Sequence, residues 1–342
     1  MYRLQKLRPP SRALLKVSNL TIRLATDSGL LVTPVEDVSF GLNAGEVLGL
    51  LGESGAGKST LALALLRILP NGFRAESGSI EFDGRGLLQL AENEMREIRG
   101  AQVSLIPQDA SGLNPVLRVM EQVAEVLHAH RDWTMERCRQ EGRATLEMVG
   151  LAGEDLARAY PHQLSGGQRQ RVSIAQALAC NPALIIADEP TASLDAVATR
   201  EILKLLQYLK ARLHTAFLFI SHQPQVLESL TDRLLVMYSG RIVEEGPTHQ
   251  VFHDPLHPYT RELLRCDLRK LNGKFNEGRE NSASRVPFIP GAPPDLMRPS
   301  RGCAFESRCP KRGDLCATCS PAESTPSPGR VVRCFEYGGE CE

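Results

Sequence analysis

The chain has 342 residues, which is enough for about two domains and a sizeable buried core. Its 40 basic residues balance 40 acidic ones, so no overall electric field attracts nucleic acid or anionic lipid. No apolar run approaches the roughly 18 residues of a membrane span, and the first residues lack the apolar core of a signal peptide. We therefore expect a soluble, unsecreted, cytoplasmic protein whose nine cysteines are thiols or metal ligands rather than disulfides.

Residues 1–12 carry four basic side chains and no acidic one. Short charged runs are usually solvated, so this pattern predicts a basic N-terminal arm exposed to water rather than a segment that binds lipid.

From residue 15 to residue 46, short alternating strands and turns predict an added antiparallel sheet. Further along, buried strands alternate with helical stretches, which predicts an α/β fold with a parallel sheet covered on both faces. Ligands should then gather at the carboxyl ends of its strands. The expected strands are Val47–Leu51, Val103–Ile106, Ala183–Ala187 and Ala216–Ile220. The expected helical stretches are Thr60–Leu69, Arg169–Cys180 and Glu201–Leu213, and Val119–Gly150 is mostly helical and could be an inserted helical subdomain.

A glycine-rich loop follows the first buried strand and opens a helix, in the pattern of a phosphate-binding P-loop. Glycines let successive backbone N–H groups turn toward phosphates, and the helix N-terminus adds positive charge. Lys58 would contact the β- and γ-phosphates, and the Ser59 hydroxyl would ligate Mg²⁺. The residues predicted to bind the nucleotide are Gly52, Glu53, Ser54, Gly55, Ala56, Gly57, Lys58, Ser59 and Thr60.

Polar side chains also follow three other expected strands. Asp188 would hold Mg²⁺, directly or through water, and Glu189 would polarise the attacking water. His222 would contact the γ-phosphate and that water, although a lone histidine is more often structural. Gln108 would ligate Mg²⁺ and sense the γ-phosphate, although a single glutamine is weak support. An acidic pair alone would more simply mark the exposed end of a strand. Because a P-loop is also present in the sequence, we favour a catalytic role for Asp188 and Glu189.

The run Leu164–Gln168 precedes a long helical stretch, so its N–H groups and hydroxyl would form a second anion site at a helix N-terminus. The P-loop already surrounds its own phosphates. We therefore expect this second site to cap the γ-phosphate bound to another subunit, through Ser165, Gly166, Gly167 and Gln168.

In this order, the motifs resemble those of the ATP-binding subunits of ABC transporters, over roughly residues 15–265. The resemblance implies a RecA-like P-loop core with an antiparallel β subdomain and a helical subdomain, at about 109–180, within a domain spanning 13–266. It also implies that ATP drives closure of two subunits. Under the family's names, Gln108 is the Q-loop residue, Asp188 the Walker B aspartate, Asp195 the D-loop residue, and Glu189 and His222 the catalytic residues.

Other segments resemble the oligopeptide, dipeptide and nickel importer branch: Ile106–Pro115, Tyr160–Gly167 and His257–Thr260. This resemblance implies an ATPase at the cytoplasmic face of the inner membrane that energises peptide import. Its partners would be a second ATPase subunit of a different chain, two permease subunits and a periplasmic binding protein, with no nucleic acid. Import of nickel or another small solute, and a soluble ABC-type ATPase not coupled to transport, remain alternatives. The family usually has an aromatic residue that stacks on adenine, where this chain has Leu24.

The last part of the chain divides into a polar, proline-containing linker at 267–301 and a Cys-rich extension at 302–342. The spacing of its cysteines matches neither a common zinc ribbon nor a ferredoxin, but the scarcity of apolar residues predicts a metal-held minidomain. Resemblance to the importer branch favours a 4Fe–4S cluster, with Zn²⁺ as the alternative and free thiols or a redox disulfide after that. The expected ligands are Cys303, Cys309, Cys316 and Cys334, and Cys319 and Cys341 could compete with them.

Overall fold

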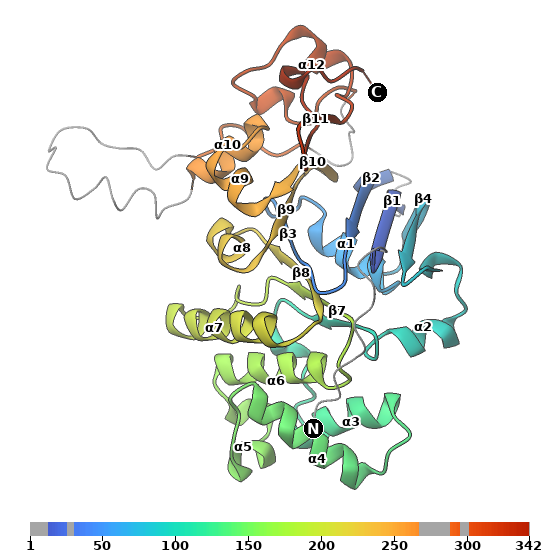
Figure 1. The fold of residues 1–342 in the computed structure, drawn as a ribbon, viewed down its shortest axis with the longest axis vertical. Helices are drawn as coiled ribbons and strands as arrows, with labels where there is room; N and C mark the ends of the chain where they lie inside the picture. The colour runs from blue at the N-terminus through green and yellow to red at the C-terminus, as the bar shows by residue number, and fades with distance from the viewer. Residues whose placement is uncertain (1–12, 26–30, 267–287, 295–300, 342) are drawn as a thin grey trace, which may run out of the picture.

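The computed structural model describes residues 13–25, 31–266, 288–294 and 301–341 (Figure 1). The expected basic arm at 1–12 and most of the expected linker at 267–301 lie outside these ranges. Two sheets carry the fold, one with eight strands and one with four. No helix in the described ranges is both long enough and apolar enough to span a bilayer.

The eight-stranded sheet has the strand order β11-β12-β10-β9-β3-β8-β7-β6. Its parallel part consists of β3 (Val47–Leu51), β6 (Val103–Ile106), β7 (Leu184–Asp188), β8 (Ala216–Ser221) and β9 (Arg233–Tyr238). Every residue of β3, β7 and β8 is buried, which explains why their sequences are continuous apolar runs rather than alternating ones. The predicted parallel sheet is confirmed.

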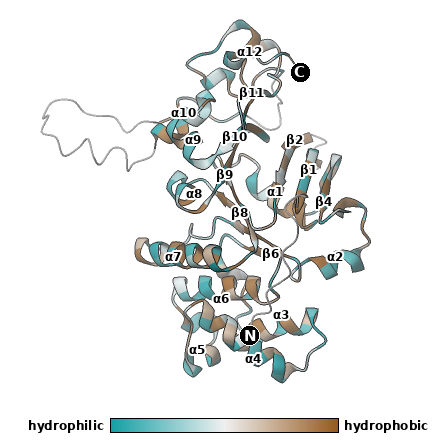
Figure 2. Cartoon of the chain, viewed as in Figure 1, coloured by the Kyte–Doolittle hydropathy of each residue, from teal (hydrophilic) through white to brown (hydrophobic). Residues whose placement is uncertain are grey.

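Apolar side chains cover both faces of this sheet, because successive side chains of a strand point to opposite faces. In β3, Val47 and Leu51 belong to one buried cluster, and Leu48 and Leu50 belong to the other. One face packs against helices α6 (Gly166–Leu178), α7 (Ala196–Arg212) and α8 (Pro224–Leu230). Figure 2 shows the hydrophobic strands in the middle of the molecule, whereas α2 (Glu92–Ile98) and α5 (Glu154–Arg158) at its periphery are more hydrophilic.

The opposite face packs against α1 (Lys58–Leu65) and a four-stranded antiparallel sheet, ordered β2-β1-β4-β5. Its strands are β1 (Leu15–Ala25), β2 (Leu31–Leu42), β4 (Phe73–Phe82) and β5 (Arg85–Gly86). The expected antiparallel subdomain is therefore present. Strand β4 was not expected, because most of its first seven residues are polar and exposed.

The helical subdomain contains α3 (Val119–His130), α4 (Met135–Met148), α5 and α6. Helix α4 begins where the Thr134 side chain accepts a hydrogen bond from the Arg137 backbone N–H, so the expected helical region is interrupted at this cap. Helices α6 and α7 start three and five residues earlier than expected, because Ser165 and Asp195 cap them. Periodicity had located the apolar faces of these helices but not their capped first turns.

The C-terminal extension continues the large sheet beyond β10 (Arg241–Pro247), at the end of the molecule opposite the helical subdomain (Figure 1). Strand β12 (Arg330–Val332) pairs with β10, and β11 (Ser324–Ser327) pairs with β12. Helices α9 (Thr248–His253) and α10 (Pro258–Arg265) follow β10 before the extension begins, and α12 (Asp314–Thr318) lies within the extension.

Buried arginines fasten the extension to the rest of the chain. Arg330 Nη2 lies 2.7 Å from Glu244 Oε1, and the two side chains are 4% and 0% exposed. The Glu244 carboxylate also accepts hydrogen bonds from the backbone N–H groups of Leu256 and His257. A buried ion pair is tolerated when its remaining hydrogen-bonding capacity is used in this way. Strand β12 and this buried ion pair therefore join the extension to the rest of the chain, although Arg330 Nε has no hydrogen-bond partner among the described residues.

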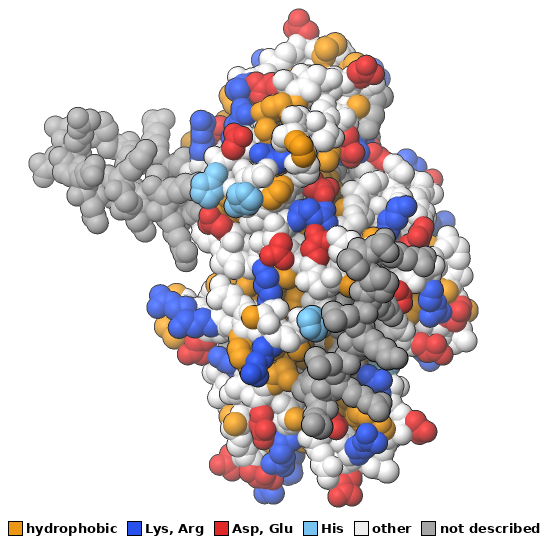
Figure 3. All heavy atoms as spheres, in the orientation of Figure 1, with side chains coloured by type: hydrophobic (Ala, Val, Ile, Leu, Met, Phe, Trp, Pro, Cys, Tyr) orange, Lys and Arg blue, Asp and Glu red, His pale blue; other side chains and the backbone are white. Residues whose placement is uncertain are grey.

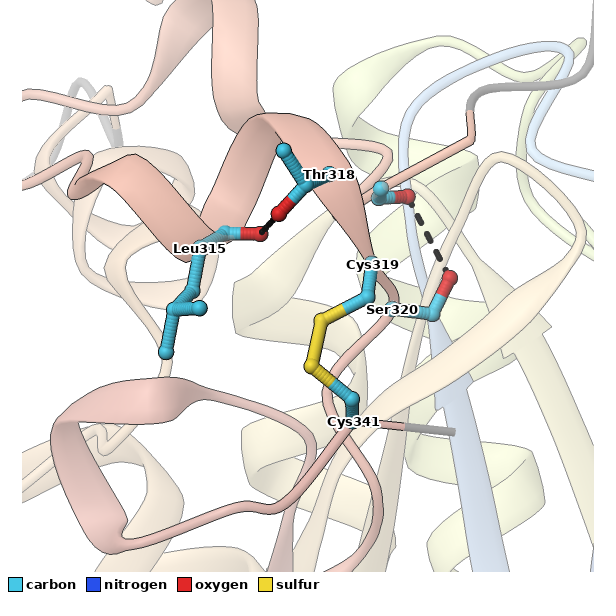
Figure 4. Close-up of a disulfide and its surroundings, with 6 residues drawn as sticks. Leu315, Thr318, Cys319, Ser320 and Cys341 are labelled. Atoms are coloured by element: carbon cyan, nitrogen blue, oxygen red, sulfur yellow. Dashed lines mark hydrogen bonds between the residues drawn. A yellow bond between two sulfur atoms is a disulfide. The ribbon is translucent and has the colours of Figure 1, made fainter.

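Cys319 and Cys341 form a disulfide in the extension, with their Cα atoms 5.6 Å apart (Figure 4). The expectation that the cysteines are thiols or metal ligands rather than disulfides is therefore wrong for these two, as is the expectation that they could compete as metal ligands. Pairing of the last residues with the chain after α12, through Pro321 and Cys341 and through Ala322 and Glu340, brings the two thiols together. The expectation came from the cellular compartment, which says nothing about which cysteines the fold brings within bonding distance. The other seven cysteines are free.

Acidic and basic side chains are interspersed over the face of the molecule seen in Figure 3. This mixture agrees with the net charge of zero. The visible face offers no broad positive surface of the kind that follows a nucleic-acid backbone.

Candidate active site

Four neighbouring parallel strands end at the same edge of the large sheet, in the order β3-β8-β7-β6. The P-loop follows β3, His222 follows β8, Asp188 ends β7 with Glu189 next to it, and Gln108 lies two residues beyond β6. The topology thus brings the expected phosphate, magnesium and water-activating residues to one edge, although they are far apart in the sequence.

The backbone of the P-loop passes so close to its neighbours that side chains are excluded at two positions. A Cβ atom on Gly57 would lie 1.9 Å from the carbonyl oxygen of Pro34, and one on Gly52 would lie 2.4 Å from that of Met237. Gly57 also has φ of 103°, in the left-handed region that favours glycine. The glycines are therefore required by packing against β2 and β9 as well as by the path of the loop.

Lys58 is held inside the P-loop with a relative exposure of 6%. Its Nζ donates to the carbonyl oxygens of Gly52 at 2.8 Å and Glu53 at 2.9 Å. Burial lowers the pKa of Lys58, while the nearby carboxylates of Glu189, Asp188 and Glu53 oppose that shift. The ammonium group is thus held inside the loop by backbone carbonyl oxygens.

Asp188 is buried and incompletely partnered. Its Oδ1 atom has no hydrogen-bond partner among the described residues, while the Ser59 hydroxyl hydrogen-bonds to the carboxylate. Burial raises the pKa of Asp188, and the neighbouring Glu189 adds to this, while Ser59 and Lys58 act in the opposite direction. A buried, orphaned carboxylate oxygen beside a hydroxyl is a suitable pair of ligands for Mg²⁺. The residues present therefore fit the magnesium ion predicted from the sequence.

Glu189 and His222 are in direct contact. The Nδ1 atom of His222 lies 2.6 Å from Glu189 Oε1, and the His222 backbone N–H donates to the same oxygen at 2.8 Å. Ser221 donates its hydroxyl to the other carboxylate oxygen at 3.2 Å. Glu189 has φ of 47°, an unusual conformation for a non-glycine residue that turns the chain sharply after Asp188. The structure thus brings the two expected catalytic side chains together.

Ser221 is a functional candidate that the sequence analysis missed. It is 2% exposed, and its hydroxyl also accepts a hydrogen bond from the Gln223 backbone N–H. Its position immediately before His222, at the end of a buried strand, was the available signal. Gln108, by contrast, is exposed, two residues beyond the end of β6.

The signature residues lie away from the P-loop of the same chain. Ser165 and Gln168 form a capping box at the start of α6, with Ser165 Oγ accepting from the Gln168 backbone N–H at 3.2 Å. Asp195 caps α7, and a Cβ on Gly167 would lie 3.2 Å from Ala198 Cβ. Figure 1 shows α6 and α1 in separate parts of the molecule. Within the described ranges, no hydrogen bond joins residues 165–168 to residues 52–60.

Leu24 occupies a half-buried position on β1, where its register partner on β4 is Phe73. Leu24 is the position where the family resemblance led us to look for an adenine-stacking aromatic residue. Phe73 places an aromatic ring on the neighbouring strand, and no feature of the sequence pattern had drawn attention to it.

The four cysteines expected to bind metal line one cavity of about 410 Å³ in the extension: Cys303, Cys309, Cys316 and Cys334. Burial raises the pKa of the first and last of these thiols to about 11. Among the described residues, no group of three or more His, Cys, Asp or Glu side chains is arranged to hold a metal ion. The thiols therefore share a cavity, but they do not converge on a single point.

These features define a P-loop nucleotide-binding protein with a carboxylate–histidine pair at its phosphate end. Residues 35–192 match the model of the ABC transporter family, and residues 243–316 match that of the oligopeptide/dipeptide transporter C-terminal region. The chain belongs to the ABC transporter ATP-binding proteins of the oligopeptide and dipeptide type, which confirms the resemblance and the fold class predicted from the sequence.

Similar proteins agree with this assignment. The chain is 41% identical to the oligopeptide transport ATP-binding protein OppD of Salmonella typhimurium over 329 residues, covering 96% of this chain and 95% of that protein. It is 39% identical to the dipeptide transport ATP-binding protein DppD of Bacillus subtilis, covering 94% of each chain.

Solved structures show the same cassette. The dimeric, post-hydrolysis ATP-binding cassette MJ0796, bound to ADP and Pi, aligns with a TM-score of 0.62 and 28% identity, over 68% of this chain and 98% of that one. The cbiO1 subunit of the cbiONQ transporter from Clostridium perfringens aligns with a TM-score of 0.61 and 27% identity, over 77% and 95% of the two chains.

Replacing Asp188 by Asn should stabilise the protein in the absence of nucleotide and magnesium. The raised pKa of Asp188 means that its charge costs folding free energy as the pH rises above about 4, the usual pKa of aspartate, so wild-type stability should fall over that range. Asp188→Asn removes that cost, and we expect a gain of about 1 kcal/mol at pH 7, the order of relieving a partly unpaired buried charge. Urea unfolding at pH 5 and pH 8 with a chelator measures it.

The exposed Asp132 provides the matched control, because Asp132→Asn removes the same charge from the surface. An identical pH dependence of unfolding in wild type and Asp188→Asn would contradict the electrostatic account of the site.

Proposed function

We propose that this chain is the ATP-hydrolysing subunit that energises import of di- and oligopeptides. The contact between Glu189 and His222 at the phosphate end of the P-loop supports hydrolysis, because it holds a carboxylate where an attacking water would be polarised. The names of the similar transport proteins and the oligopeptide/dipeptide C-terminal region support a peptide as the cargo. No feature of the described residues favours nickel or a role uncoupled from transport.

In this mechanism, the backbone amides of residues 52–60 and the Lys58 ammonium bind the β- and γ-phosphates. Ser59, Asp188 and Gln108 would hold Mg²⁺, and the bound ion would neutralise charge on the phosphate oxygens. Glu189 accepts the proton of the attacking water. His222 orients the Glu189 carboxylate through the 2.6 Å contact of its Nδ1 atom, and its Nε2 atom would be the one to contact the γ-phosphate.

The separation of the signature from the P-loop supports a composite site made by two subunits. Ser165, with the backbone N–H groups at the start of α6, would cap the γ-phosphate held by the P-loop of the partner ATPase. Asp195 and the first turn of α7 lie beside the signature and would meet the same partner. We propose that this partner is a second ABC ATPase subunit of a different chain.

The proposed assembly also contains two permease subunits and a periplasmic binding protein that selects the cargo, with this chain bound peripherally at the cytoplasmic face of the inner membrane. Within the chain, we propose an ATP-binding domain at 13–266, a linker at 267–301 and the Cys-rich extension at 302–342. The described part of the linker, 288–294, packs near the P-loop, since Pro293 and Pro294 line a small cavity with residues 53–56.

Uptake of labelled di- and tripeptides by a strain lacking this gene tests the function. Wild-type protein should restore uptake, while Glu189→Gln should lower kcat for ATP hydrolysis by at least about a hundredfold and abolish uptake without loss of ATP binding. Nickel uptake is measured in parallel. Restoration of nickel but not peptide uptake would transfer the assignment to nickel, and a Glu189→Gln protein with wild-type turnover would refute the catalytic role.

Ser165→Arg should leave ATP binding by the isolated chain unchanged, because Ser165 does not contact its own P-loop in the described structure. In the assembled transporter, the same change should lower ATP hydrolysis by about a hundredfold, the order seen when a hydrogen-bond donor to a transition-state oxygen is removed. Equilibrium binding of a fluorescent ATP analogue and steady-state hydrolysis are the measurements. Weaker binding by the isolated Ser165→Arg chain would contradict the two-subunit site.

The four-cysteine cavity supports a metal cofactor in the extension, and we propose a 4Fe–4S cluster in preference to Zn²⁺. A zinc ion draws four thiolates within about 4 Å of one another, because Zn–S bonds are about 2.3 Å long. A 4Fe–4S cluster is bound by four separate thiolates around a larger body, which better suits thiols that line a cavity without converging. The cluster would supply a cross-link between segments that have little apolar content.

Anaerobically purified protein should contain about four iron and four acid-labile sulfide atoms per chain. Cys309→Ser should lose most of this iron, whereas Cys266→Ser, which changes a free cysteine outside the cavity, should keep it. One equivalent of zinc without iron would establish the alternative metal, and the absence of both metals would refute a metal-held extension.

A further inference from the structure

A side chain from the extension, that of Arg308, contacts the P-loop. Arg308 lies between Phe305 and Cys309 in sequence, and its side chain is 3% exposed. Its Nη1 and Nη2 atoms donate to the two carboxylate oxygens of Glu53 at 2.8 and 3.2 Å, in a two-point contact. Glu53 is the second residue of the P-loop and lies 255 positions earlier in the chain.

The remaining donors of Arg308 are also used. Nε donates to the carbonyl oxygen of Pro290 at 3.0 Å, Nη2 to that of Ile289 at 3.3 Å, and Nη1 to the Tyr238 hydroxyl at 3.2 Å. These contacts fix the guanidinium plane and, with it, the Glu53 carboxylate. The planar fork of an arginine suits this task, whereas a lysine could not make all of these bonds at once.

Glu53 is held through its backbone as well. Its N–H donates to the Tyr259 hydroxyl at 2.9 Å, and its carbonyl oxygen accepts from Lys58 Nζ. Arg308 is therefore separated from the phosphate-binding ammonium by a single residue of the P-loop. Without Arg308, the Glu53 carboxylate would be an uncompensated negative charge close to the place where a triphosphate binds.

The segment that carries Arg308 is firmly docked. Phe305, 1% exposed, packs against Tyr238 and Tyr259 with ring centroids 5.2 and 5.5 Å apart. The segment begins and ends with cysteines that line the cavity, Cys303 and Cys309. A change in the cavity would thus be transmitted directly to the residue that holds Glu53.

We propose that Arg308 is a positioning residue for ATP binding: it neutralises and fixes Glu53 in the P-loop, and through this contact the nucleotide affinity depends on the docking of the Cys-rich extension. This inference rests on the proposed ATP site, and not on the identity of the cargo or of the metal. It assigns a role at the ATP site to a part of the chain that lies outside the ATPase core.

The first test is Arg308→Gln in the full chain. Loss of a hydrogen-bonded charge pair at the loop should raise Kd and KM for ATP by about tenfold or more, with a much smaller change in kcat, because Arg308 touches no reacting atom. Arg308→Lys, which keeps the charge but loses the fork, should lie between wild type and Arg308→Gln. Arg312→Gln is the matched control, because Arg312 pairs with Glu306 at the surface, and it should behave as wild type.

The double variant Arg308→Gln/Glu53→Gln separates positioning from mere structural damage. If the uncompensated carboxylate weakens binding, removing it should recover most of the lost ATP affinity. If Arg308 only supports folding, the double variant should bind ATP no better than Arg308→Gln and should unfold at least as easily. That second result, or an unchanged Kd in Arg308→Gln, would overturn the proposal.

Coupling to the cavity is tested with Cys309→Ser. This change should weaken binding of a fluorescent ATP analogue in the chain with Arg308 and have little further effect in the chain with Arg308→Gln, because both act through one contact. Strictly additive effects, or no effect of Cys309→Ser in either chain, would refute the coupling. This test measures nucleotide binding alone. Its outcome is therefore independent of whether other variants lose ATP hydrolysis or peptide uptake.

Discussion

The structure depends on one constraint: a highly charged ligand must be bound at the edge of a buried sheet, where charge is costly. The P-loop lies at this edge, and its backbone can approach its neighbours closely because Gly57 and Gly52 stand opposite the carbonyl oxygens of Pro34 and Met237. Strands β3, β7 and β8 are buried throughout, so their ends are fixed relative to one another. The rigidity of the site thus comes from apolar packing beneath it.

Several ionisable side chains meet at this edge of the sheet. Asp188 and Glu189 add negative charge next to Lys58, and Glu53 adds another carboxylate within the loop itself. His222 contacts Glu189 and Arg308 contacts Glu53, while Asp188 retains an unpartnered oxygen that fits a cation. Lys58 lies among these carboxylates, with its ammonium group bonded to the carbonyl oxygens of Gly52 and Glu53.

The extension belongs to this electrostatic arrangement and is more than an appended module. It joins the large sheet through β12, closes its own end with the Cys319–Cys341 disulfide, and inserts Arg308 beside the P-loop. Its main apolar side chain, Phe305, packs against Tyr238 of the core rather than forming an independent interior of the extension. Because the extension has little apolar interior of its own, it is held together by the disulfide and is attached to the core by ion pairs.

The sequence by itself determined the P-loop, the buried strands, the parallel sheet and the family, because each depends on residues close together in the chain or on one repeated spacing. Strand β4 was not predicted because most of its residues do not alternate between apolar and polar side chains. Only the tertiary structure decided the Glu189–His222 contact, the role of Ser221, the disulfide and the bond from Arg308 to Glu53. These are contacts between segments 22 to 255 residues apart, and a local pattern carries no information about which distant side chains the folded sheet brings together.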